Sequence, residues 1–305
     1  MIKFGGRKIA DIRIGNFAIR EVWLGNDVVW KRNDFLTFTA LDPNLAVKFN
    51  HIPKARLVYS TDGGVSWSDY TRSSTIVLPY AGSTIMFKAS PDGNERVCGE
   101  GDGYCFSFSG RVVSSGNVNS LLRQEGYENI LELPDFCYHQ LFKNCTSLIS
   151  APELPSTSLG EACYQKMFLG CSSLVSAPKL PATLLSDVSY SSMFKNCTSL
   201  ISAPALPSVN VPYACYSHMF QGCTSLKYAK NIAASNFGSL ATTYMFEGCN
   251  NLEEIGIAYT GIFDGSFTGW VDGVSPTGTL RYSGTDTTRG VSAIPEGWTV
   301  VPYEG

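Results

Sequence analysis

Apolar positions recur with a fixed period between residues 137 and 257. Five phenylalanines stand 26 residues apart, and five cysteines follow three positions behind them: Phe142, Phe168, Phe194, Phe220 and Phe246, with Cys145, Cys171, Cys197, Cys223 and Cys249. A period of 20 to 50 residues is typical of stacked repeats, in which each unit buries its apolar side only against its neighbours. We therefore predict a stack whose core holds these rings and thiols.

Within one unit the apolar spacing changes. Residues 163–171 carry apolar side chains at i, i+4, i+5 and i+8, which predicts a short helix. Residues 174–181 carry Pro178 and Pro181, and proline cannot donate to a sheet ladder, so only two or three residues before Pro178 can pair as a strand.

The repeated motif F-x-x-C-T-S-L-x-x-A-P-x-L-P resembles the BspA-like leucine-rich repeats of Bacteroides surface proteins and of the crAss-like phages that infect such bacteria. The resemblance implies a leucine-rich-repeat solenoid over residues 137–257, an N-terminal cap over 111–136 and a β C-terminal cap over 258–305. Gly116 stands one period before Phe142, so this cap is expected to lack the core ring.

Residues 1–33 form a second pattern, in which apolar alternation is broken by glycine every ten residues. This predicts short strands joined by tight turns. So short a segment cannot bury its own apolar side chains, and Trp23, Trp30, Ile14 and Leu24 are the candidate anchor contacts. The segment resembles the N-terminal segments of phage tail and fibre proteins, which implies an anchor or oligomerisation role and, by analogy, a homotrimer. A β-meander that decorates the next domain is the alternative.

Residues 34–110 alternate apolar and polar positions between turn signals, which predicts an Ig-like antiparallel β-sandwich. Residues 60–67, STDGGVSW, are similar to the Asp-box of sialidases. One box without an arginine cluster favours a structural hairpin, in which the aspartate caps its own turn.

Composition narrows the function. The 305 residues carry a net charge of −3 with no basic stripe, which argues against nucleic acid as a partner, and no apolar tract is long enough for a membrane helix. Residues 1–33 carry seven Lys/Arg against three Asp/Glu, consistent with a solvated face or with docking onto an acidic partner. The opening residues lack an apolar leader, which favours assembly in the host cytoplasm over export, unless a leader has been removed.

Chemistry-bearing residues are few. Eight of the ten cysteines belong to the repeat and are predicted to be buried, while Cys98 and Cys105 could form a disulfide bridge in an oxidising compartment. No metal-ligand spacing, phosphate loop or nucleophile motif accompanies the three histidines. We therefore predict no enzyme, no cofactor and no metal.

Solenoids present one side chain per unit in a column, and the candidate ligand-facing column is Ser150, Ser176, Ser202 and Tyr228. Such hydroxyls can hold sugars or merely solvate a sheet. The sequence thus predicts a structural fibre protein of a virion, either a head or a tail fibre, anchored to itself and to other virion proteins by residues 1–33. Its repeat surface would attach to a host-surface glycan or protein. The alternative is an exported bacterial adhesin of BspA type on the cell surface.

Overall fold

The computed structural model describes residues 34–50, 55–71, 74–100 and 106–304 in full, and within residues 1–33 only the backbone of six short strands. These pair as three antiparallel hairpins: β1 (Lys3–Phe4) with β2 (Arg7–Lys8), β3 (Ile12–Ile14) with β4 (Phe17–Ile19), and β5 (Glu21–Leu24) with β6 (Asp27–Lys31). The anchor candidates Ile14, Trp23, Leu24 and Trp30 lie on these strands, and their side chains are outside the described part.

Two sheets follow. The first has the order β10-β9-β12-β7-β14-β16 and the second β11-β8-β13. The strands are β7 (Leu36–Ala40), β8 (Leu45–Phe49), β9 (Leu57–Ser60), β10 (Ser68–Asp69), β11 (Ile76–Leu78), β12 (Thr84–Ala89), β13 (Phe106–Phe108), β14 (Val112–Ser115) and β16 (Leu148–Ser150). Phe38 of β7 lies 4.9 Å, between ring centroids, from both Phe106 and Phe108 of β13, so the two sheets share an aromatic core.

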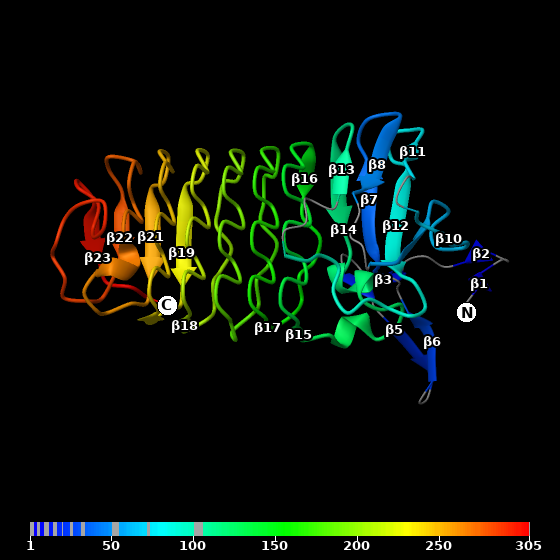
Figure 1. Ribbon diagram of the computed structural model, residues 1–305, viewed down its shortest axis with the longest axis horizontal. Helices are drawn as coiled ribbons and strands as arrows, with labels where there is room; N and C mark the ends of the chain where they lie inside the picture. The colour runs from blue at the N-terminus through cyan, green and yellow to red at the C-terminus, as the bar shows by residue number, and fades with distance from the viewer. Residues whose placement is uncertain are drawn as a thin grey trace.

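The stack continues directly from the sandwich. β14 pairs antiparallel with β7 on one side and parallel with β16 of the first repeat unit on the other. The boundary expected at residue 110 therefore falls just before the strand that joins the two parts into one sheet. Figure 1 shows the resulting slab, with the sandwich at one end and β22 and β23 at the other.

The units lie parallel and one period apart. We number them from Cys137, Cys163, Ser189, Cys215 and Ala241. Their paired segments are β15 (Glu132–Leu133) with β17 (Ser158–Leu159), β18 (Asn210–Val211) with β20 (Asn236–Phe237), and the sheet β19 (Tyr228–Ile232), β21 (Glu254–Ile257), β22 (Thr279–Arg281), β23 (Thr299–Val301). Between units one and two, and between units three and four, the pairing at this position is a single bridge, Ser150 with Ser176 and Ser202 with Tyr228.

The predicted helix in each unit is wrong. Residues 136–145 and their equivalents, which we call the turn segments, are consecutive turns. A left-handed residue occurs every fourth position, as at Phe136, Gln140 and Asn144. Alternate N–H groups bond within the unit and to the next unit: Leu141 donates to Tyr138, whereas Phe142 donates to Met167. A helix would use every amide internally, so the turns free half of them to tie the units together. Helical structure among the described residues is limited to 3₁₀ turns at η1 (Val118–Leu121), η2 (Tyr127–Asn129) and η3 (Gly265–Phe267).

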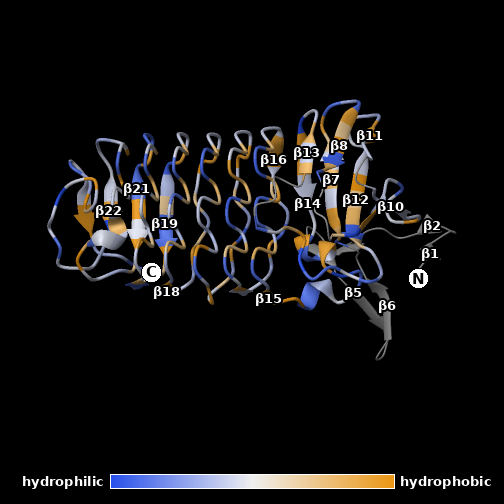
Figure 2. Cartoon of the chain, viewed as in Figure 1, coloured by the Kyte–Doolittle hydropathy of each residue, from blue (hydrophilic) through white to orange (hydrophobic). Residues whose placement is uncertain are grey.

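One aromatic spine runs through the stack. Phe142, Phe168, Phe194, Phe220 and Phe246 are fully buried, with successive ring centroids 5.4–5.6 Å apart and nearly parallel planes. The ring missing at Gly116 is supplied by Phe106 of the sandwich, 5.6 Å from Phe142. Trp270 of the C-terminal cap follows Phe246 at 6.1 Å. The apolar core is therefore continuous from one end to the other, and Figure 2 shows hydrophobic residues in every unit rather than in one centre.

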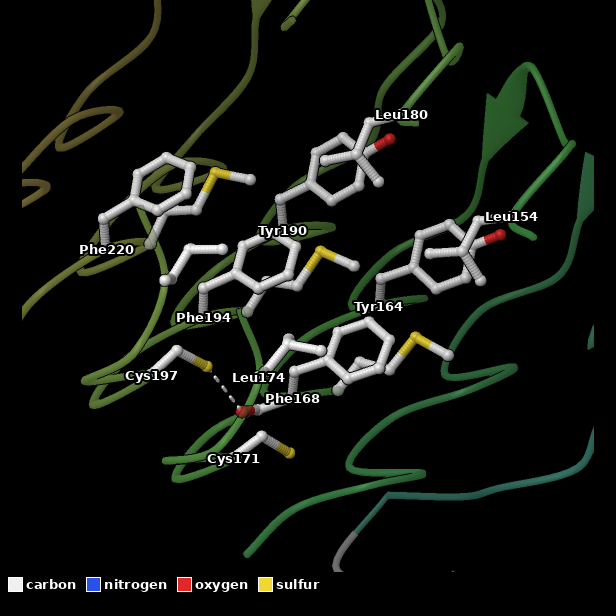
Figure 3. Close-up of a cluster of buried hydrophobic side chains, with 14 of the residues drawn as sticks. Leu154, Tyr164, Phe168, Cys171, Leu174, Leu180, Tyr190, Phe194, Cys197 and Phe220 are labelled. Atoms are coloured by element: carbon white, nitrogen blue, oxygen red, sulfur yellow. Dashed lines mark hydrogen bonds between the residues drawn. The ribbon is translucent and has the colours of Figure 1, made fainter. Parts of the chain in front are cut away.

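The cysteines three positions after the spine phenylalanines pack in the core and also make hydrogen bonds. Each thiol donates to the carbonyl oxygen of the spine phenylalanine in the preceding unit. Cys171 donates to Phe142 at 3.1 Å. Cys197 donates to Phe168 at the same distance, as Figure 3 shows. Cys223 and Cys249 repeat the contact, and Cys145 donates to Phe106. The thiols thus link neighbouring units by S–H···O hydrogen bonds.

Burial raises the pKa of the thiols of Cys163, Cys171, Cys197, Cys215, Cys223 and Cys249, to about 12 for Cys215 and Cys223. We expect no reaction of these six cysteines with an aromatic disulfide reagent at pH 8 in the folded protein, and full reaction in guanidinium chloride, because only the thiolate attacks. The unfolded thiols ionise near their ordinary value of 9.0 while the folded ones stay neutral, so stability should be complete below that pH and fall as the pH rises toward 12. Rapid labelling of Cys197 in the native state would contradict this.

A second column of buried rings consists of tyrosines, whose hydroxyl groups differ in hydrogen bonding. Tyr138, Tyr164, Tyr190 and Tyr216 stack at 5.8–6.2 Å. The Tyr138 hydroxyl donates to Asn119 Oδ1 at 2.9 Å, whereas the Tyr190 hydroxyl has no hydrogen-bond partner among the described residues.

We expect Tyr138→Phe to lower the free energy of unfolding by about 1–3 kcal/mol, because buried Asn119 loses its donor. Tyr190→Phe removes an unpaired buried polar atom, so it should be neutral or slightly stabilising. Denaturant titration of both variants measures the difference, and an equal loss in the two would refute the explanation.

Asparagine and glycine share one left-handed column: Asn144, Gly170, Asn196, Gly222 and Gly248. A Cβ on Gly170 would lie 2.4 Å from Asn144 Oδ1, whereas a Cβ on Gly248 would meet only Gly222 backbone atoms at 3.8 Å or more. Each asparagine side chain thus covers the glycine of the next unit.

Both substitutions, Gly170→Ala and Gly248→Ala, carry the same left-handed strain, so their difference isolates this contact. We expect Gly170→Ala to cost about 1–3 kcal/mol more than Gly248→Ala. In a double-mutant cycle read by denaturant titration, Asn144→Gly should recover that difference. A cycle without coupling energy would argue against the contact.

Candidate binding face of the repeat stack

The predicted hydroxyl column lies on the face that carries the bridges between Ser150 and Ser176 and between Ser202 and Tyr228, which we call the strand side. Ser176 and Ser202 are exposed. Ser150 is already engaged: its Oγ donates to Ser114 O and accepts from Ser114 N, which locks β14 to β16. At the other end Tyr228 is half-buried beneath the Lys230 ammonium, 4.7 Å from its ring centroid. The structure brings the four residues into one row, in which Ser150 is hydrogen-bonded and Lys230 covers the Tyr228 ring, whereas Ser176 and Ser202 are exposed.

Two apolar furrows lie beside that row, and the sequence analysis missed them. The first has a volume of about 420 Å³ and the second about 380 Å³. Their walls are the A-P-x-L-P segments of units one to three, residues 151–155, 177–181 and 203–207. We call them the proline furrows, because each wall contributes two prolines three positions apart. This P-x-x-P spacing is visible in the sequence and could have indicated the furrows.

Several apolar side chains outside the furrows are also exposed on the stack. Val175 is 45% exposed and Ile201 is 50% exposed, both next to the hydroxyl row. Across the furrows, Leu184 and Val209 are also exposed. Exposed apolar side chains gathered on one face are more informative than scattered ones, since such patches mark interaction sites.

The face changes character at unit four. Lys227 pairs with Glu253 at 3.3 Å, and Glu254 accepts from both Lys230 and Arg281 at 2.6 Å. Burial raises the pKa of Glu254, but the hydrogen bonds from Lys230 and Arg281 outweigh it, so the net pKa lies below the usual range. Charged side chains thus replace the prolines at this end, and each of them makes an ion pair.

The Asp-box forms the hairpin between β9 and β10. Asp62 accepts hydrogen bonds from Val65 N and Ser66 N and from the hydroxyls of Ser60 and Ser66. Those to Ser66 are the main reason its pKa lies below the usual range. Trp67 packs edge-on against Phe35 at 5.3 Å, beneath the Lys88 ammonium. The carboxylate therefore holds its own turn.

The histidines do not converge. His139 is buried, with Nδ1 3.2 Å from Gly99 O. His218 Nδ1 lies 2.6 Å from Ser217 Oγ, and burial followed by the charge of Lys195 lowers the pKa of His218. His51 and Cys105 lie outside the described residues, so the Cys98–Cys105 bridge stays a prediction.

The described residues lack two features, a metal-binding cluster and a membrane-spanning helix. They contain no group of three or more His, Cys, Asp or Glu side chains that could hold a metal ion. Within the same part of the chain, no helix has the length and apolar character needed to cross a membrane.

Comparison of the chain with models of protein families, with curated proteins and with solved structures finds no match. The fold is a mainly β architecture with very little helix, in which a sandwich continues into a stack of 26-residue units.

Proposed function

We propose that this chain is a non-enzymatic binding protein of a virion, a fibre anchored by residues 1–33 that presents its repeat stack to the surface of a Bacteroides-type host. In this proposal the stack is a BspA-type leucine-rich-repeat solenoid, and the two-sheet domain is an Ig-like spacer. The observation that carries it is the continuous spine from Phe106 to Trp270, which makes sandwich, repeats and cap one rigid body.

Rigidity suits a receptor-facing part. Binding by a preformed surface loses little conformational entropy, and a stack offers long flat faces rather than a closed cleft. The strand side, with exposed Ser176 and Ser202 beside exposed Val175 and Ile201, is the face that differs most from an ordinary solvated surface. Attachment to a host-surface glycan or protein is the activity that this face supports.

The anchor is tested by mass in solution. Light scattering of the whole chain should give about three times 33.1 kDa for a homotrimer, and a chain lacking residues 1–33 should be a monomer. Monomers in both cases would remove the anchor from the proposal.

The binding role is tested on cells. Fluorescently labelled whole chain should bind Bacteroides-type cells, and an excess of unlabelled protein should block both this binding and infection by the phage that carries the gene. A bacterial adhesin of BspA type is the alternative function. It predicts the protein on bacterial surfaces, outside any virion, which antibody labelling of cells and purified particles would distinguish. Absence of binding to cells and to a glycan array would leave a purely architectural role and defeat the proposal.

A further inference from the structure

The walls of the proline furrows are rigid and shaped alike. Pro152 and Pro155 face Pro178 and Pro181 across the first furrow, and the latter pair faces Pro204 and Pro207 across the second. Beneath them Leu154, Leu180 and Leu206 are buried in the core. Proline has a fixed φ and the leucines are immobilised, so these walls lose little freedom when a ligand enters.

The chemistry of the lining favours an aromatic occupant. It consists of proline, alanine and leucine side chains with two charged ones, Glu153 and Lys179. Among the described residues, no aromatic ring and no amide side chain lines either furrow, whereas carbohydrate sites use such groups to stack and orient sugar rings. Proline rings in P-x-x-P segments pack against aromatic side chains, as in the recognition of polyproline by aromatic-lined grooves. Here the prolines belong to the stack, so the partner supplies the rings.

The charge at the furrows indicates which charged group the partner should carry. Lys179 lines both furrows, is exposed and makes no ion pair within the described part of the chain. Among the described residues that line the second furrow it is the only charged side chain, because Ala205 stands where Glu153 and Lys179 stand in the preceding units. A cation beside an apolar furrow is complementary to a carboxylate next to a ring.

The spacing favours a polypeptide. Successive units are about one ring spacing apart, 5.4–5.6 Å in the spine. Side chains two residues apart on one face of an extended chain are separated by roughly 6.6 Å. The rings of residues i and i+2 of one extended segment can therefore lie over neighbouring furrows, with a difference in spacing of roughly 1 Å.

We propose that the proline furrows bind an extended protein segment with aromatic side chains at i and i+2, whose carboxylate pairs with Lys179. The inference rests on the proposed function only in assigning binding to the stack, and it names a protein rather than a glycan as the partner of this face.

The test uses the whole chain with ¹³C-labelled alanine methyl groups, because Ala151, Ala177 and Ala205 line the furrows. Indole-3-acetate is the probe, with tryptamine as the ring of opposite charge. We expect indole-3-acetate to shift the Ala177 and Ala205 methyl signals at millimolar concentration and to bind about threefold more tightly than tryptamine. The signal of buried Ala241 should stay in place.

Lys179→Glu should reverse the order of the two probes. Lys195→Glu, on the turn side, is the matched control and should leave the order unchanged. Equal binding of the two probes, absence of furrow shifts up to about 10 mM, or stronger shifts with glucuronate than with indole-3-acetate would each overturn the inference. Cell binding is measured separately, so furrow binding without cell binding would defeat the proposed function and leave this inference standing.

Discussion

Replacement of Gly116 by alanine is expected to lower the free energy of unfolding by about 3 kcal/mol or more. Gly116 has a φ of +78°, and its added Cβ would lie 2.1 Å from Phe35 O, a backbone atom that cannot move aside. Left-handed backbone costs an L-residue roughly 1–2 kcal/mol, and overpacking adds about 1–3 kcal/mol.

The position of Gly116 explains why this loss of stability should affect the whole molecule. Asn117 N donates to Asp34 O, and Gly116 O accepts from Glu153 N. Gly116 therefore lies where the first strand of the sandwich, the cap and the first unit meet. A defect there should loosen the junction between sandwich and stack.

Gly126→Ala is the matched control. Gly126 is also left-handed, with φ +67°, but its Cβ would meet nothing within 4 Å. Its loss should be confined to the backbone strain, about 1 kcal/mol. Denaturant titration followed by tryptophan fluorescence compares the two, and similar losses would mean that the junction is not tightly packed.

Phe194→Ala should have the largest effect of any single truncation in the repeats, about 3–5 kcal/mol. The Phe194 ring is fully buried and stacks on Phe168 and Phe220 at 5.6 Å on both sides. In a stack, stability is carried by contacts between neighbouring units, so one truncation weakens two interfaces.

Ile201→Ala, in the same unit but 50% exposed, is the control and should cost less than about 1 kcal/mol. Both variants are compared by thermal and denaturant unfolding. If the interfaces are coupled as the spine indicates, Phe194→Ala should also broaden the transition, because the two halves can then unfold separately. Equal effects of the two substitutions would mean that the ring column does not carry the stability.

Local sequence pattern anticipated the repeated core and missed what joins it to the rest. Phe106 precedes Phe142 by 36 residues and Trp270 follows Phe246 by 24, so neither keeps the 26-residue spacing. Their place in the spine depends on sheet pairing between β14 and β16 and on the packing of the cap, which no periodicity reports. The helix predicted for residues 163–171 failed for a related reason, because every second amide bonds to the neighbouring unit instead of within its own.

For the candidate site too, one part was predictable from the sequence and another part depended on the tertiary structure. The column of Ser150, Ser176, Ser202 and Tyr228 was predictable, because equivalent positions of stacked units must align. Its outer members are engaged by Ser114 and Lys230, which depends on contacts across the fold. The prolines were visible in the sequence, but whether they fill a core or form open furrows depends on how far apart neighbouring units lie.

By itself the sequence determined the unit, its period and the residues that must be buried, because chemically identical positions repeated at one spacing can share one environment only by stacking. Tertiary structure alone decided that the sandwich and the cap extend the same spine, that the thiols bond between units, and that the strand side bears the furrows. Those outcomes depend on hydrogen bonds and ring contacts between residues that are distant in sequence and follow no period.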